Sequence, residues 1–460
     1  MNGKTVDYGE STMPAALDEL IRKAGVVGAG GAGFPTHVKV QAKVDTVLVN
    51  GASCEPLLAS DIVLMEHEAA SMLHGLVRVL DHTGAARGIV CVKGKHRGAV
   101  AELRRAVAVD DRLTFFELGD FYPAGDEHVL VNEVLGRTVP EAGLPLQVGV
   151  LVANVESLCN IDRAAAGLPV THRFLTVAGE VRTPLVLRVP VGTPVGDIIA
   201  LAGGATVRAF RIIDGGPMMG RVLADSDQPV TKTTSGILVL PDDHNVVRAK
   251  VMDPEKLRRF TQTVCCQCTM CTDLCPRYLL GHSLHPHKLM RGFGTQLLTG
   301  EIAREALLCS ECGICEKYAC PMLLSPREIN AQIKQELRAK GIRWQPGNAP
   351  MQLRALRQER KIPTSRLLER LGLAAYHSHP AYDTREVRPS RVILRLQQHI
   401  GAPAVPVVAR GEIVTTGDLI GDIPGQALGA RIHASIDGRV TSVTETAITI
   451  ESTNRGLPCP

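Results

Sequence analysis

Aromatic residues and an excess of either charge are both lacking in this sequence. Of its 460 residues, 3% are aromatic and one is tryptophan, and 51 lysines and arginines against 47 aspartates and glutamates leave a formal net charge of +4. This balance gives no reason to expect a nucleic acid or an anionic membrane as partner. No apolar run approaches the roughly 18 residues of a membrane-spanning helix. Residues 1–7 lack a basic stretch leading into an apolar one, so we predict no secretion signal and expect a cytoplasmic protein without direct membrane insertion.

The hydrophobic pattern predicts a multidomain α/β protein. Helix-like and strand-like segments alternate in residues 1–170, which predicts an α/β domain with a largely parallel sheet. A hairpin, a short helix and a returning strand predict a β-grasp (SLBB-like) module over 171–245. A helical, cysteine-bearing region over 250–340 precedes a polar and basic stretch, which we expect to be a helical linker over 341–398. Short β segments separated by glycines predict a further domain over 399–455.

This last domain resembles a lipoyl-type barrel-sandwich hybrid. A lipoyl or biotinyl carrier needs an acceptor lysine, yet no lysine follows Lys361 in the sequence. We therefore expect a structural or docking module and not a swinging arm.

Cysteines are concentrated in one region, because nine of the 13 lie between residues 265 and 320. In a chain without an export signal, such clustering indicates metal binding and not disulfides. Two ferredoxin-type runs are present, C-x2-C-x2-C-x3-C-P and the same run with one extra residue before its last cysteine. In two-cluster ferredoxins the remote cysteine of each run binds the other cluster. We therefore predict a ferredoxin-like domain with two [4Fe–4S] clusters, one held by Cys265, Cys268, Cys271 and Cys320 and the other by Cys309, Cys312, Cys315 and Cys275.

Alternatives exist for this region. Structural zinc favours two separated C-x2-C pairs, a pattern that two complete ferredoxin-type runs do not match. Cys266 is a spare thiol within the first run and is expected to be a packing residue. His282, His285 and His287 could supply an axial ligand to a corrinoid cobalt or another metal, but we favour a solvated turn with capping histidines.

A glycine-rich segment, GAGGAG at 28–33, formally matches G-x-G-x-x-G. A dinucleotide fingerprint must follow a strand and open a helix, whereas here a helical pattern precedes it and Phe34-Pro35 follows, so an ordinary Rossmann site is not predicted. Glycines let backbone amides approach a phosphate or a planar ring, and Lys39 adds a charge for a phosphate. The alternative is a flexible glycine turn.

Several segments together resemble known electron-transfer families. Five segments of this chain resemble loops of the NADH-binding, FMN-containing subunit of respiratory complex I. They are residues 28–36 (GAGGAGFPT, with Lys39), 50–56 (NGASCEP), 122–127 (YPAGDE), 154–157 (NVES) and 215–220 (GGPMMG). Two ferredoxin-type runs with a β-grasp module resemble the RnfC component of Rnf electron-transport complexes. A barrel-sandwich segment at the C-terminal end narrows the resemblance to the cobalamin (corrinoid) reductases of propanediol-utilisation microcompartments, over nearly the whole chain.

This resemblance implies an FMN between the glycine loop and segment 154–157, reduced by NADH, so that residues 1–170 form a flavin- and nucleotide-binding domain. No catalytic side chain is expected, because the cofactors carry the chemistry. The sequence departs from the family at Ser53, where the family has a glutamate beside the nicotinamide, and the effect on NADH use stays open. The implied cofactor-binding residues are Gly28, Gly30, Gly31, Gly33, Phe34, Lys39, Asn50, Glu55, Tyr122, Gly125, Asp126, Glu127, Asn154, Glu156 and Ser157.

The function that the resemblance implies is electron transfer from NADH, through FMN and the two clusters, to cob(III)alamin and cob(II)alamin. That activity would support cobalamin recycling for a diol dehydratase, with an adenosyltransferase and a microcompartment shell protein as partners, inside or at the shell of a bacterial microcompartment. Two alternatives stay open. One is an Rnf-type protein that hands electrons to a protein partner, and the other is a shell-associated redox conduit that does not itself oxidise NADH.

Overall fold

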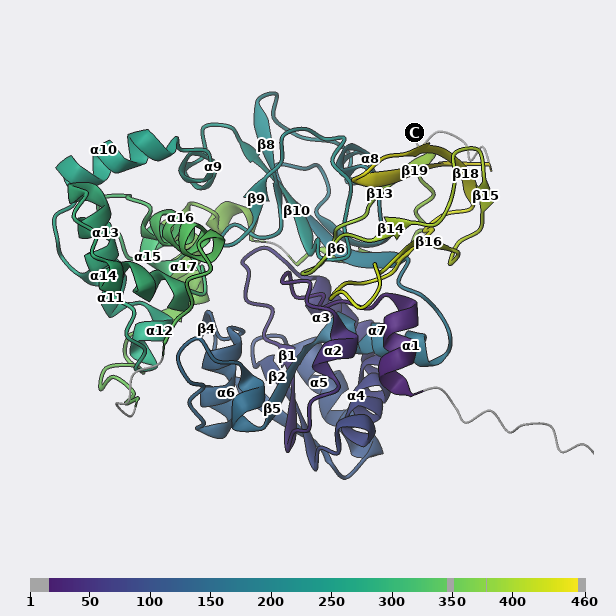
Figure 1. Ribbon diagram of the computed structural model, residues 1–460, viewed down its shortest axis with the longest axis horizontal. Helices are drawn as coiled ribbons and strands as arrows, with labels where there is room; N and C mark the ends of the chain where they lie inside the picture. Colours follow the sequence, from purple (N-terminus) through teal and green to yellow (C-terminus); the bar gives the residue numbers. More distant parts are fainter. Residues whose placement is uncertain (1–15, 346–350, 378, 454–460) are drawn as a thin grey trace, which may run out of the picture.

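A computed structural model describes residues 16–345, 351–377 and 379–453 of the protein. Residues 1–7, in which no secretion signal was predicted, lie outside this part. Figure 1 shows four groups of elements: an α/β domain at the bottom, a sheet-containing module above it, a helical domain on the left and a β domain at the upper right. Among the described residues, no helix combines the length and the apolar character that a membrane span requires.

The α/β domain has a four-stranded sheet in the order β3–β2–β1–β5, and all of its strand pairs are parallel. Side chains alternate between two cores, so that Val47 and Val49 pack on one face while Leu48 packs on the other. Strands buried on both faces explain the continuous apolar runs in the sequence. The strands are β1 (Thr46–Gly51), β2 (Arg87–Lys93), β3 (Leu113–Leu118) and β5 (Val150–Asn154). The accompanying helices are α1 (Leu17–Ala24), α2 (Thr36–Lys39), α3 (Ser60–His67), α4 (Ala69–Thr83), α5 (Arg97–Ala106), α6 (Glu127–Leu135) and α7 (Val155–Ala165).

The β-grasp module contains the predicted hairpin, helix and returning strand: β6 (His172–Gly179), β7 (Leu185–Pro190), α8 (Val195–Leu201) and β8 (Phe210–Asp214). Its six-stranded sheet has the order β12–β7–β6–β10–β8–β9. β9 (Arg221–Val222) lies at one edge. Strand β10 (Gly236–Pro241), which the sequence analysis does not predict, lies near the centre, parallel to β6 and antiparallel to β8.

The helical domain contains α9 (Asn245–Lys250), α10 (Pro254–Val264), α11 (Met270–Asp273), α12 (Pro276–Leu279), α13 (Pro286–Thr295), α14 (Gly300–Arg304), α15 (Ile314–Lys317) and α16 (Pro326–Ala339). Its core holds apolar residues from α10, α13 and α16 together with several of the clustered cysteines. The short helices α11 and α15 each begin within one ferredoxin-type run. These short elements put the cysteines on loops and helix ends.

The predicted helical linker over 341–398 is wrong in part, because strands lie within it. Only α17 (Thr364–Leu371) and a 3-10 turn at Ala374–Tyr376 are helical among its described elements. β11 (Ile362–Pro363) pairs with β4 (Phe121–Tyr122), and β12 (Ala381–Asp383) adds to the edge of the β-grasp sheet beside β7. Strands of two or three residues are too short to show a period of two, so the sequence pattern gives no signal for them.

The β domain begins earlier than expected, at β13 (Arg391–Arg395), where Val392 and Leu394 alternate into the core. One sheet has the order β13–β19–β18–β15 and the other β14–β16–β17. These strands are β14 (Val405–Pro406), β15 (Ile413–Val414), β16 (Leu419–Asp422), β17 (Ile432–His433), β18 (Gly438–Val443) and β19 (Ala447–Ser452). The predicted multidomain α/β fold class is confirmed.

Candidate functional site

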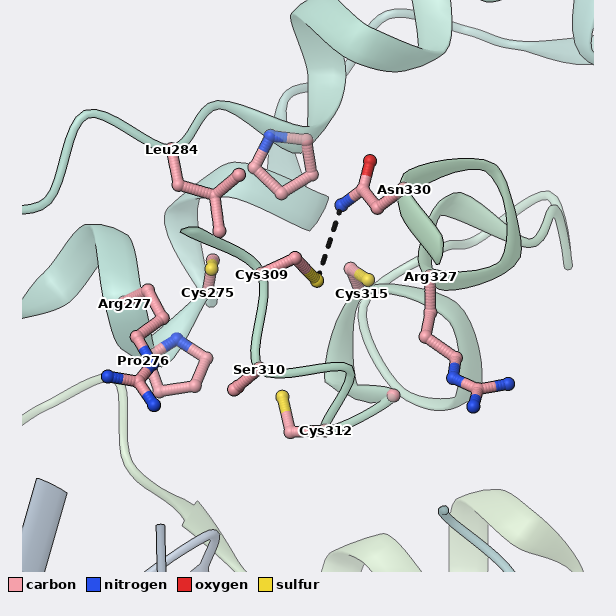
Figure 2. Close-up of a pocket in the computed structure, with 12 residues that line it drawn as sticks. Cys275, Pro276, Arg277, Leu284, Cys309, Ser310, Cys312, Cys315, Arg327 and Asn330 are labelled. Atoms are coloured by element: carbon pink, nitrogen blue, oxygen red, sulfur yellow. Dashed lines mark hydrogen bonds between the residues drawn. The ribbon is translucent and has the colours of Figure 1, made fainter. Parts of the chain in front are cut away.

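Four cysteines from three segments line one pocket of the helical domain, as Figure 2 shows. Cys275 precedes α12, Cys309 and Cys312 lie on the loop before α15, and Cys315 belongs to α15. Cys275, Cys309 and Cys315 are buried. We call these four residues the inner cysteine set. The remote cysteine of the first run thus lies with the triplet of the second run.

A second pocket is lined by Cys265, Cys268, Cys271 and Cys320, which we call the outer cysteine set. Cys268 is exposed and Cys265 is partly exposed, so this set is more open to solvent than the inner one. Cys266 lines the same pocket and is exposed, so it is not the packing residue that the sequence analysis expected. The structure therefore brings together both predicted groups of four cysteines.

The backbone takes the same unusual shape around the middle cysteine of each run. Gln267 and Thr269 flank Cys268 with φ of 55° and 64°, and Glu311 and Gly313 flank Cys312 with φ of 60° and 82°. Left-handed residues of this kind form backbone concavities whose N–H groups bind anions, Fe–S clusters included. The shared shape supports equivalent roles for the two runs.

Hydrogen bonds to sulfur are present in both sets. The Glu311 N–H donates to Cys309 Sγ at 3.3 Å, and Asn330 Nδ2, joined to the same sulfur by the dashed line in Figure 2, lies 3.7 Å from it. The Leu324 N–H donates to Cys320 Sγ at 3.3 Å. Such bonds tune the potential of a cluster.

The cysteine thiols fit a cluster whose iron-containing core is positively charged. Burial raises the pKa of Cys275 to about 12, so a thiolate at this position requires a compensating positive charge such as iron. Within the described ranges, no three His, Cys, Asp or Glu side chains converge as a group that could hold a single metal ion. Four thiols spread around a pocket suit a larger cubane.

The glycine loop lies between α1 and α2. Gly28 N–H donates to the Phe34 carbonyl at 2.9 Å and Gly33 N–H donates to the Gly28 carbonyl at 3.2 Å, which closes the loop. Gly31 has φ of 103° and is exposed, as is Gly30, so side-chain-free backbone forms the tip. A helix precedes the loop as the sequence predicts, the short helix α2 after it was not predicted, and the tip offers a bare backbone surface for a planar ring.

Buried contacts fix this loop to the start of α7. Ala29 N–H donates to Ser157 Oγ at 2.9 Å, and Arg173 donates to the Ala29 carbonyl at 2.7 Å. Arg173 also pairs with Glu156 at 2.6 Å. Asn154 caps α7 by accepting from the Glu156 N–H at 2.9 Å. Three predicted residues, Asn154, Glu156 and Ser157, therefore help to attach the glycine loop to α7. Arg173 is central to this network and was not predicted.

The two further loops of the predicted nucleotide site meet at Gly125. Asn50 Nδ2 donates to the Gly125 carbonyl at 2.9 Å, and the Gly125 N–H donates to Cys54 Sγ at 2.9 Å. Lys39, predicted to pair with a phosphate, forms an ion pair with Glu127 at 3.1 Å. Asn50 lies near the carboxyl end of β1 and Cys54 on the loop after it, whereas Lys39 ends α2 and Glu127 begins α6.

Glu55 is held by the turn at 215–220. Its carboxylate accepts from the Met218 N–H at 3.0 Å and the Met219 N–H at 2.8 Å. Burial raises the pKa of Glu55, although these amides oppose the shift. Neighbouring Ser53 has φ of 41° and donates to the Leu58 carbonyl at 3.3 Å.

The loop at 122–127, part of the predicted nucleotide site, touches the inner cysteine set directly. Tyr122 Oη donates to the Cys312 carbonyl at 2.6 Å. Asp126 pairs with Arg277, two residues after Cys275, at 2.9 Å. Although burial opposes it, Arg277 lowers the pKa of Asp126. No sequence pattern relates these positions, because the contacts join two domains.

The histidines after the first run do not form a solvated turn, so that expectation is wrong. His282 is 1% exposed, and its ring lies 5.4 Å from that of His128. His285 Nδ1 lies 3.0 Å from Glu305, and His287 Nδ1 lies 2.7 Å from the Thr272 hydroxyl. Packing of the helical domain against α6 buries His282, whereas His285 and His287 stay partly exposed.

Family models match the modules in chain order. The Nuo51 FMN-binding domain matches residues 21–163, the SLBB domain 174–222, the 4Fe-4S dicluster domain 264–325 and the RnfC barrel sandwich hybrid domain 383–458. Fold and matches together define a multidomain protein with flavin-binding and iron–sulfur domains.

Within that class the relatives are specific. The chain is 46% identical over 452 residues to the cobalamin reductase PduS of Citrobacter freundii, a match that covers 97% of this chain and 99% of that protein. A second cobalamin reductase PduS, from Salmonella typhimurium, is 46% identical over 436 residues, 94% of this chain and 96% of the relative. The chain belongs to the cobalamin reductase PduS family, and the predicted family resemblance is confirmed.

A solved structure gives a weaker likeness. An NAD+-reducing [NiFe]-hydrogenase in the H2-reduced state aligns with a TM-score of 0.48 and 20% identity, over 73% of this chain and 64% of that chain.

Proposed function

We propose that this protein is a cobalamin reductase that passes electrons from NADH, through FMN and two [4Fe–4S] clusters, to cob(III)alamin and cob(II)alamin. The observation that carries the proposal is the 46% identity to a cobalamin reductase over 97% of the chain. The FMN-binding and dicluster domains supply the two kinds of cofactor that such a route needs.

The flavin would be held by the glycine loop and the start of α7. Flavin chemistry converts the hydride of NADH into single electrons. Gly30 and Gly31 leave the loop tip bare, Ser157 fixes the loop to α7, and Asn154 caps that helix. The N-terminus of α7 adds a positive field that suits an anionic group.

The nucleotide would be oriented by Glu55 and Glu127, both already positioned by bonds to the protein. Glu55 is tied to backbone amides of the turn at 215–220, and Glu127 is tied to Lys39. A phosphate that binds near Lys39 would compete with Glu127 for it. Ser53, in place of the family glutamate, leaves one carboxylate fewer beside the nicotinamide.

The inner cysteine set would receive electrons first, because Tyr122 of the loop at 122–127 contacts Cys312. The outer set provides a second one-electron centre, so the two electrons of one NADH are stored together. Eight cysteines would then act as cluster ligands, four in each set. The thiolate sulfurs are also the acceptors for the N–H···S bonds from Glu311 and Leu324.

Resemblance to the propanediol-utilisation reductases supports a place inside or at the shell of a microcompartment. An adenosyltransferase would consume the reduced corrinoid, and a shell protein would be the docking partner. The β domain, which lacks an acceptor lysine, is the candidate docking module. Corrinoid, NADH and these two proteins are the partners that we propose.

The test is an anaerobic assay on protein with counted iron and FMN. NADH and hydroxocobalamin are added, and the visible spectrum is followed for cob(II)alamin. Each NADH releases two electrons and a proton, so it should convert two cob(III)alamin to two cob(II)alamin. Formation should be lost in a Cys268→Ala and Cys312→Ala double variant. The matched control is Cys159→Ala, a buried thiol in the α/β domain.

Two other outcomes identify the alternatives. If NADH bleaches the flavin but cobalamin stays oxidised, the acceptor is a protein and the Rnf-type function replaces this proposal. If the flavin is present and does not bleach, the protein does not oxidise NADH and the conduit function replaces it.

A further inference from the structure

An open cavity of about 460 Å³ lies in the helical domain, apart from both cysteine pockets. Met252 and Leu257 form an apolar side, near the start of α10. Other lining residues, Glu328, Gln332 and Gln335 among them, belong to α16. The volume falls in the range of small-molecule sites, roughly 300–1,000 Å³.

The cavity also borders the loop of the inner cysteine set. Lys334 donates to the Cys309 carbonyl at 2.7 Å and to the Glu311 carboxylate at 2.8 Å. Lys334 and Glu311 both line the cavity. A molecule in the cavity therefore lies one side chain away from the backbone that carries Cys309 and Cys312.

We propose that this cavity binds one edge of the corrinoid substrate, an inference that rests on the proposed function. The corrin periphery carries methyl groups and primary amides. Methyl groups suit Met252 and Leu257, whereas amides donate to and accept from Gln332 and Gln335. A corrinoid is larger than the cavity, so the remainder of the macrocycle lies over its open side. Electron transfer then needs no further carrier after the inner cysteine set.

The test blocks the cavity without touching a cysteine. In Ala331→Trp, an indole on α16 fills the cavity that Ala331 lines. The matched control is Ala339→Trp on the same helix, at an exposed position that does not line the cavity. Hydroxocobalamin binding is measured by equilibrium dialysis, and FMN reduction by NADH and iron content are measured on the same samples. We expect Ala331→Trp to weaken binding at least tenfold with FMN reduction and iron unchanged, and the control to bind like wild type.

A milder variant guards against misfolding. Gln335→Ala removes an exposed amide that lines the cavity and should weaken binding a few-fold, whether or not Ala331→Trp folds. If wild type binds and reduces cobalamin while Gln335→Ala and folded Ala331→Trp bind within twofold of it, the cavity is not the site and the proposed function stands. If wild type neither binds nor reduces cobalamin, the proposed function itself fails, and this inference fails with it.

Discussion

Replacing Arg173 with methionine should loosen the glycine loop, because Arg173 is the centre of a buried network. Arg173 and Glu156 are 2% and 1% exposed and pair at 2.6 Å. Arg173 also donates to the carbonyls of Ala29 and Thr234, each at 2.7 Å. Glu156 accepts in addition from the Phe174 N–H at 3.1 Å. The substitution leaves a buried carboxylate unpaired and two carbonyls without this donor.

The expected cost follows from burial. Removing one partner of a buried ion pair costs about 3–5 kcal/mol, mostly from the charge left behind. A matched exposed pair, Arg104 with Glu117 at 2.8 Å, has side chains 60% and 49% exposed, so Arg104→Met should cost about 0–1 kcal/mol. The double variant Arg173→Met with Glu156→Gln should regain part of the loss, because no charge is then stranded.

Hydrogen exchange of α7 and β6 measures the local opening free energy, which suits a multidomain chain better than one global unfolding curve. A flavin fluorescence titration measures FMN affinity. In Arg173→Met this affinity should decrease together with the opening free energy, because Arg173 holds the Ala29 carbonyl of the glycine loop. A cost of Arg173→Met below about 1 kcal/mol would refute the argument from burial. So would a double variant no more stable than the single one.

Three further predictions concern the junctions between domains. Tyr122→Phe removes the 2.6 Å bond to the Cys312 carbonyl, so it should shift the potential of the inner cluster and not of the outer one in an EPR-monitored redox titration; equal shifts of both would contradict it. Burial lowers the pKa of His282 to about 4, whereas its ordinary value is about 6.5. Between pH 6.5 and 4 only the unfolded chain therefore binds the proton. The free energy of unfolding should fall by about 1.4 kcal/mol for each pH unit of acidification in this range. Thermal unfolding should show a flatter acid slope for His282→Phe, and an unchanged slope would contradict the assignment. Burial lowers the pKa of Lys232 to about 7, so between pH 7 and about 10.4 only the unfolded chain holds the proton. The free energy of unfolding should therefore rise with pH in wild type but not in Lys232→Met. Unfolding measured at pH 7 and at pH 9 checks this difference.

Local pattern was enough to predict the fold class and the grouping of the cysteines. Parallel strands such as β1 and β5 are continuous apolar runs, because both of their faces are buried. Spacing alone relates Cys275 to Cys309, since a triplet and a remote cysteine recur twice. The structure brings these two residues into one pocket, and their role as cluster ligands stays a prediction.

Contacts made only in the folded protein escaped prediction. Arg173 is a charged residue at the start of an apolar strand, and nothing in the sequence relates it to Ala29, 144 residues away. β11 and β12 are two and three residues long, and each is stabilised by a partner strand from another module. Burial of His282 depends on α6 packing against the iron–sulfur domain, whereas its own neighbours, Gly281 and Ser283, are typical of an exposed turn.

Hydrogen bonds between side chains and main chain hold the loops near Glu55, Tyr122 and the inner cysteine set in place. Tyr122 donates to the Cys312 carbonyl, amides of the turn at 215–220 donate to Glu55, and Lys250 donates to carbonyls of the same turn. Bonds to backbone hold a loop whatever the side chains of that loop do, and electron transfer requires centres held at fixed positions. Lys250 also lines the cavity beside α16. The turn at 215–220 thus contacts both Glu55 and Lys250, so the order that we propose for nucleotide, inner cysteine set and corrinoid rests on contacts between modules and not on their order in the chain.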